Sequence, residues 1–221
     1  YLTILLAGLG IFGVFLFLTY YMQVNLGFSQ IRCGFAFIVM PISIVSSSMV
    51  AQTKLLPKVG PRPLMLFGMV MSAAGMVYLA QLGSVNPATT SPARTYFVHV
   101  MPALLMFGIG FGNIFATAIN TATMGVAPRD AGVASALVNT CQQVGGAAGT
   151  ALLSTIALNA TKSWAIANPK AGPLAAAVHG YTVSFWVSAG IFVVGAVIAG
   201  VTVRPGKVDL DAAHGAPSGA H

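Results

Sequence analysis

The apolar residues of the chain fall into six long runs, and the charged residues lie in the stretches between them. A membrane-spanning helix needs about 20 consecutive, mostly apolar residues. This criterion predicts six helices, at about 1–24, 34–52, 64–82, 97–124, 131–158 and 181–203. Every Lys, Arg and Asp lies outside these ranges. We therefore expect an all-α membrane protein whose membrane portion carries no charge.

The composition supports a membrane protein and argues against a nucleic-acid-binding one. The chain is 57% hydrophobic and 6% charged, whereas soluble domains have about 25% charged residues. The net charge is +7, but the ten Lys and Arg residues are scattered and form no basic stripe. We therefore expect membrane lipid as a partner and no nucleic acid. The chain begins inside an apolar run at Tyr1, as expected for a piece of a longer protein.

The loop charges predict the orientation in the membrane, because Lys and Arg accumulate in short cytoplasmic loops. The side with more of them holds Lys54, Lys58, Arg62, Arg129, Arg204 and Lys207, and the other side holds Arg32, Arg94, Lys162 and Lys170. We expect the first side to be cytoplasmic. The tail, residues 204–221, is small, polar and rich in Gly and Pro, which predicts a disordered cytoplasmic segment. Its two His residues are too far apart to suggest a metal site, and we expect no cofactor.

The two halves of the chain resemble each other at an offset of 98 residues. One ungapped window of about thirty residues contains seven identities, including Gly27/Gly125 and Gly34/Gly132. Each copy has two glycines seven residues apart at the turn after a long predicted helix, Gly27 and Gly34 in the first copy and Gly125 and Gly132 in the second. The two turns are predicted to lie on opposite sides of the membrane. The pattern predicts two inverted three-helix repeats, which are typical of transporters.

A polar stripe runs along the predicted helix at 131–158. Its residues are separated by steps of four, three, four and three, so they share one helical face: Ser135, Asn139, Gln142, Gly146 and Gly149. Unpaired amides are costly in hydrocarbon, so this face, with the neighbouring Gln143, is predicted to meet a cavity or another helix. Gly145 and Gly149 form a small-xxx-small pair that favours close helix packing.

The predicted helix at 97–124 carries a second stripe, Asn113, Thr117 and Asn120, for which a cavity wall and an interhelical hydrogen bond are both open. The glycines before it, Gly108, Gly110 and Gly112, indicate close helix packing. No strand precedes this G-x-G-x-G run, so it is not a dinucleotide loop. Pro41, in the middle of the second helix, predicts a kink.

Several of these motifs together resemble the fourteen-helix drug:proton antiporter branch of the major facilitator superfamily. The resemblance rests on Pro128, on residues 131–135, on Asn139-Thr140, Gln143 and 145–147, on Tyr21-Met22-Gln23, and on Gly60-Pro61-Arg62. It implies the C-terminal six-helix half of an exporter of amphipathic small molecules, driven by proton antiport through alternating access. It also implies an N-terminal half as partner and a location in the plasma membrane or the bacterial inner membrane.

The resemblance assigns roles to further residues. Tyr21 and Gln23 would lie near the outer mouth of the transport path. Lys54, Lys58, Gly60 and Arg62 would belong to the cytoplasmic loop motif of the superfamily, although this copy has no acidic residue. The six predicted helices contain no carboxylate, so proton coupling would depend on the other half.

Three other functions are weighed against the exporter. A metabolite or sugar facilitator of the same superfamily would have the same six helices. An intramembrane hydrolase needs a nucleophilic Ser beside a His, but His99 and His179 fall at helix ends and no nucleophile motif surrounds Ser135 or Ser154. An inactive structural membrane fragment is the third alternative. For the exporter, the two polar stripes and the resemblance together give these candidate residues of the substrate cavity: Tyr21, Gln23, Asn113, Thr117, Asn120, Ser135, Asn139, Gln142 and Gln143.

Overall fold

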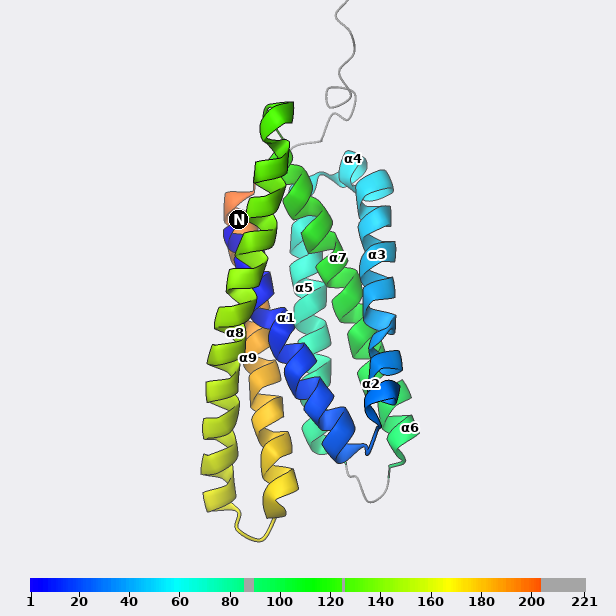
Figure 1. Ribbon diagram of the computed structural model, residues 1–221, viewed down its shortest axis with the longest axis vertical. Coiled ribbons are helices and arrows are strands. Elements are labelled where there is room, and N and C mark those ends of the chain that lie inside the picture. The colour runs from blue at the N-terminus through cyan, green and yellow to red at the C-terminus, as the bar shows by residue number, and fades with distance from the viewer. Residues whose placement is uncertain (86–89, 125, 204–221) are drawn as a thin grey trace, which may run out of the picture.

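The structure is a computed structural model that describes residues 1–85, 90–124 and 126–203. All regular secondary structure in these ranges is helical, and six long helical segments run roughly parallel to one axis (Figure 1). The predicted disordered tail, residues 204–221, lies outside the described residues.

The first three segments are built from helices α1 to α5. Segment I is α1 (Leu2–Tyr20) followed by a π-helical turn (Tyr21–Asn25). Segment II consists of α2 (Gln30–Phe37), α3 (Val39–Val50), a π-helical turn (Ala51–Leu55) and α4 (Leu56–Val59). Segment III is α5 (Pro61–Ala80), which ends in a 3₁₀ turn (Gln81–Ser84).

The last three segments are built from helices α6 to α9. Segment IV consists of α6 (Pro92–Thr95), a π-helical turn (Tyr96–Val100) and α7 (Met101–Thr123). Segment V is a 3₁₀ turn (Pro128–Asp130) and α8 (Ala131–Ala167). Segment VI is α9 (Gly172–Thr202).

Segments II, V and VI are longer than the ranges 34–52, 131–158 and 181–203 that hydropathy predicts. Hydropathy marks only the part of a helix that suits hydrocarbon, whereas the helix continues through polar residues such as Lys162. At 1.5 Å per residue, α8 is about 55 Å long, well beyond the roughly 30 Å hydrocarbon core. Five segments are both long and apolar enough to span a membrane by themselves, and α8 is the exception because small and polar residues line it.

Pro41 explains the break between α2 and α3. Proline has no backbone N–H, so the carbonyl of Phe37, four residues earlier, loses its helical partner. The α-helix is interrupted at Ile38, whose N–H donates to the Phe35 carbonyl at 3.2 Å. The α-helical hydrogen bonding of segment II is therefore interrupted one turn before Pro41, near the place where the sequence predicts a kink.

The packing of the segments shows the two repeats. Helix α1 packs against α8, and α7 packs against α3 in the corresponding way. Likewise α9 packs against α1 as α5 packs against α7, while α5 and α9 pack against each other. Figure 1 shows α5 and α9 behind α1 and α7, with α3 and α8 at the two sides. The predicted arrangement of two inverted three-helix repeats is thus what the helices form.

Glycines allow the closest helix contacts. A Cβ on Gly110 would lie 2.6 Å from the Gly68 carbonyl oxygen of α5, and a Cβ on Gly108 would lie 2.6 Å from the Ser43 Cβ of α3. Since residues 108 and 110 point to opposite sides of α7, this helix is held closely between α3 and α5. The Ser47 hydroxyl donates to the Gly108 carbonyl at 3.4 Å across the α3–α7 contact.

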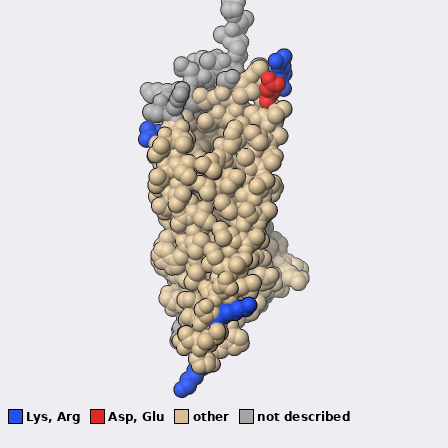
Figure 2. Space-filling view, turned by 90° about the vertical axis from the view of Figure 1, so that its left-hand side faces the viewer, with Lys and Arg blue, Asp and Glu red and all other residues tan. Residues whose placement is uncertain are grey.

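The charged side chains lie at the two ends of the bundle. Figure 2 shows Lys and Arg at both ends of the visible face and none across the apolar middle. Among the described residues, the ion pair between Arg129 Nε and Asp130 Oδ2, at 3.5 Å, is exposed. The uncharged belt between the ends is the part of the surface suited to hydrocarbon.

Candidate functional site

A groove opens on the side of the bundle where α1, α2, α3, α7 and α8 meet. Its volume is about 400 Å³. We call it the Gln142 groove, and its lining residues are Ile11, Phe15, Gly34, Phe37, Ile38, Met40, Pro41, Ile44, Phe111, Phe115 and Gln142. Neither α5 nor α9 contributes to it. Segments I, II, IV and V thus form the groove, and segments III and VI lie behind them.

Gln142 provides the only polar side chain among the described residues that line the groove. Its position follows from the close crossing of α1 and α8. The Gln142 carbonyl meets Gly8 of α1, Gly145 meets the Leu5 carbonyl, and Gly149 meets the Leu9 carbonyl. Because these glycines let the two backbones touch, the Gln142 side chain lies at the edge of α1, half-buried, and forms no hydrogen bond with another described residue.

Aromatic rings form much of the groove wall. Phe15 of α1 lies against Phe37 of α2, with ring centroids 5.3 Å apart, and Phe111 and Phe115 come from α7. The break at Ile38 places residues from both α2 and α3 in the lining. A large apolar wall with a single amide is the usual chemistry of a site for amphipathic small molecules.

The sequence did not point to these phenylalanines. A Phe on an apolar helix is expected to face lipid or to pack, and Phe15 is partly exposed. The repeat at an offset of 98 residues matches Phe115 of the groove with Phe17. This match does not mark a groove residue, because Phe17 is buried elsewhere and stacks on Tyr181, with ring centroids 5.7 Å apart.

The predicted stripe on α7 lies outside the groove lining. Asn113 and Thr117 are buried. All three residues donate to carbonyls of their own helix: Asn113 to Ile109 (2.7 Å), Thr117 to Asn113 (2.7 Å) and Asn120 to Ala116 (2.9 Å). The Asn113 Oδ1 atom is buried and has no hydrogen-bond partner among the described residues. In the structure these side chains belong to the packing and backbone bonding of α7.

The other polar residues of α8 point in different directions. Ser135 is half-buried, Asn139 and Gln143 are exposed, and Gly146 meets the Phe12 ring of α1. Of the predicted stripe, only Gln142 lies in the groove lining. The exposed amides share one face with Gly132, Ala136 and Ala147, which are also exposed.

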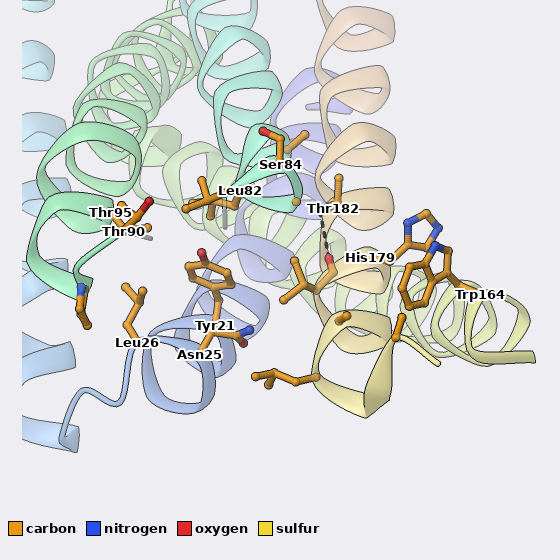
Figure 3. A pocket seen from close by; sticks show the side chains of 18 residues that line it. Tyr21, Asn25, Leu26, Leu82, Ser84, Thr90, Thr95, Trp164, His179 and Thr182 are labelled. Carbon is orange, nitrogen blue, oxygen red and sulfur yellow. Dashed lines mark hydrogen bonds between the residues drawn. The ribbon is translucent and has the colours of Figure 1, made fainter. Parts of the chain in front are cut away.

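Tyr21 and Gln23 lie near the end of α1 and face different surroundings. Tyr21 is buried and lines a separate cavity of about 670 Å³, the Tyr21 cavity, together with residues of α5, α6, α8 and α9 (Figure 3). Gln23 is half-buried in the π-helical turn that follows α1. Neither residue lines the Gln142 groove.

The predicted loop motif forms the turn from α4 to α5. Gly60 has a φ of 82°, a backbone conformation that favours glycine, and it separates the two helices. Lys54 and Lys58 are exposed, and Arg62 lies half-buried in the first turn of α5. The turn thus presents cations at one end of the bundle.

Comparison with known proteins identifies the family. Residues 1–150 match the model of the Major Facilitator Superfamily. The chain belongs to this superfamily. The resemblance and the fold class that the sequence predicts are thereby confirmed, and the protein is a multi-pass protein of the cell membrane.

Three curated relatives are drug or antibiotic exporters or resistance proteins by name. The chain is 39% identical over 206 residues to the puromycin resistance protein of Streptomyces alboniger, which covers 92% of this chain and 40% of the relative. It is 32% identical over 155 residues to the cephamycin export protein of Amycolatopsis lactamdurans (70% of this chain, 30% of the relative). It is 30% identical over 156 residues to a multidrug resistance protein B homolog of Mycobacterium tuberculosis (70% and 27%). The chain therefore spans less than half of each relative.

Proposed function

We propose that the chain forms the C-terminal half of a proton-driven exporter of amphipathic small molecules, and that the Gln142 groove is its wall of the substrate path. The observation that carries the proposal is the groove itself. It lies among four segments, its wall is aromatic and aliphatic, and one uncharged amide projects into it. A substrate with an apolar ring and a hydrogen-bonding group suits this wall.

The exposed face of α8 supports a second half as partner. Gly132, Ala136, Asn139, Gln143 and Ala147 lie on this face. Lipid offers no hydrogen bonds to the two amides, whereas another helix offers both close packing and polar partners. The matched region makes up 40% of the puromycin resistance protein, so the rest of such a relative is long enough to supply a partner that covers this face.

Proton coupling would then depend on the partner half. The three acidic residues of this chain are Asp130 and two in the tail. Asp130 lies exposed in the 3₁₀ turn at the start of segment V, and the tail lies outside the described residues. Coupling requires a group that gains and loses a proton within the path. Alternating access would bring such a group in the other half opposite the Gln142 groove.

The test is to replace Gln142 by Leu in the full-length transporter. The change removes the hydrogen-bonding amide but keeps a similar volume, so abundance in the membrane should stay normal. We expect the apparent KM for a probe such as puromycin to rise about five- to ten-fold, the effect of one lost hydrogen bond. The matched control is Gln52→Leu, which removes an exposed amide of segment II outside the groove.

Two results would contradict the assignment. If Gln142→Leu lowers the amount of protein while export per molecule stays unchanged, Gln142 is a packing residue. If export continues unchanged after the proton gradient is collapsed, protons do not drive it. That result would not bear on the role of the Gln142 groove, which the Gln142→Leu variant tests. A facilitator would show the second result together with equal flux in both directions.

A further inference from the structure

The Tyr21 cavity is a second and larger space, apart from the Gln142 groove. Its volume is about 670 Å³, within the range of sites that hold drug-sized ligands. It lies at the end of the bundle where α1 ends and where α8 and α9 meet (Figures 1 and 3). It shares no lining residue with the Gln142 groove. All of its described walls come from this one chain.

The described walls of the cavity carry no Lys, Arg, Asp or Glu. A charged ligand buried here would therefore lack a partner, and the cost of removing it from water would remain. Apolar side chains such as Leu26, Leu82 and Val178 make up much of the remaining lining. These properties favour an uncharged ligand with apolar parts.

Several polar atoms of the lining offer acceptors. The hydroxyl hydrogens of Ser84, Thr95 and Thr182 are already donated to backbone carbonyls, at 2.7, 3.3 and 2.9 Å. A hydroxyl that donates in this way can still accept. The Asn25 Oδ1 atom is buried without a hydrogen-bond partner among the described residues, so it also lacks a donor. A ligand with N–H or O–H groups can donate to these atoms.

One wall of the cavity is flat and aromatic. The Trp164 and His179 rings stack with centroids 5.6 Å apart and an interplanar angle of 21°. Figure 3 shows this pair at one side of the cavity and Tyr21 and Asn25 at another. An aromatic ring of a ligand can stack on such a surface, and the Trp164 indole provides a spectroscopic reporter.

We propose that the Tyr21 cavity is a binding site, separate from the transport path, for an uncharged molecule that carries an aromatic ring and hydrogen-bond donors. The ring lies against the Trp164–His179 pair, and the donors reach Asn25 and the hydroxyl oxygens. The site does not depend on the function proposed above, because its described walls need no partner half.

The test uses the fluorescence of Trp164 in the chain reconstituted in lipid nanodiscs. Trp186→Phe leaves Trp164 as the only Trp of the chain. The probe is N-acetyl-4-nitrophenylalanine amide, which is uncharged, donates N–H groups and quenches indole fluorescence through its nitrophenyl ring. Its acid form and its amine form without the acetyl group are an anion and a cation of the same size class. We expect saturable quenching by the uncharged probe, and at least five-fold weaker binding of both ions.

Three variants place the binding in the cavity. Ala175 lines the cavity and is exposed, so Ala175→Phe should fill the space and abolish saturable quenching. Val193→Phe adds the same ring on the exposed surface of α9, outside the cavity, and should leave binding unchanged. Asn25→Leu should weaken binding about five-fold, since the acceptor is lost. Circular dichroism checks that each variant keeps its helices.

Partition of the probe into the bilayer would overturn the proposal. In that case quenching rises without saturation, Ala175→Phe leaves it unchanged, and Trp186 in a Trp164→Phe chain is quenched equally. Tighter binding of either ion than of the uncharged probe would also overturn it. Loss of binding in Val193→Phe as well as Ala175→Phe would show that the effect is not specific to the cavity.

Discussion

Gly110 is a position where the smallest possible change, the addition of one methyl group, should disturb the packing of α7 against α5. In Gly110→Ala, the new Cβ would lie 2.6 Å from the Gly68 carbonyl oxygen and 2.6 Å from the Ser72 backbone nitrogen. Both are backbone atoms of α5, so no side-chain rotation relieves the contact. Ordinary contact begins at 3.4 Å, so α5 and α7 must separate locally by about 0.8 Å.

The cost follows from that separation. A gap of 0.5–1 Å forfeits about a quarter to a half of each dispersion contact. Added methyl groups in a packed core typically cost about 1–3 kcal/mol. For a protein of this size, each kcal/mol lowers the melting temperature by about 2–4 °C. We therefore expect Gly110→Ala to melt roughly 2–12 °C below the parent.

The assay is thermal unfolding of the detergent-solubilised protein, followed by the fluorescence of a dye that reacts with newly exposed thiols. Cys33 is buried, so it reports unfolding. The matched control is Gly190→Ala, where a Cβ would meet nothing within 4 Å in the middle of α9. Since Ala favours a helix over Gly, this control should be neutral or slightly stabilising. Equal melting temperatures for Gly110→Ala and Gly190→Ala would refute the reasoning.

Three further predictions follow from the fold. In a background without native cysteines, Lys58→Cys should be protected from impermeant thiol reagents in intact cells and Ser91→Cys should be labelled; the reverse pattern would invert the orientation. The 221-residue chain alone should give no proton-driven flux above empty liposomes, because one half provides one wall; uncoupler-sensitive flux by a monomer would contradict this. Ser184→Ala should destabilise the protein by about 0.6 kcal/mol, measured by thermal unfolding, since the Ser184 hydroxyl is shared between the Gly180 carbonyl of α9 (3.1 Å) and the Leu153 carbonyl of α8 (3.2 Å); an unchanged melting temperature would show that this shared bond contributes nothing.

The sequence alone determined the number of helical segments, but not where they end: α8 continues to Ala167 and α9 begins at Gly172, whereas hydropathy ends one helix at 158 and begins the next at 181. Hydrocarbon excludes charge, so the Lys, Arg and Asp residues mark the ends of apolar runs whatever the packing. Local chemistry also predicted the interruption near Pro41, because proline lacks the backbone N–H that a continuous helix needs. The ordered set of short motifs was sufficient to identify the superfamily.

Only the tertiary structure decided which polar residues face a cavity. Helical periodicity shows that Asn113 and Thr117 share a face, but not which neighbour that face meets. Their side chains instead bond to the carbonyls of α7. Gln142 lies in the groove because Gly8 and Gly145 set the crossing of α1 and α8. That crossing is a contact between residues more than 130 positions apart, and spacing along one helix does not encode it.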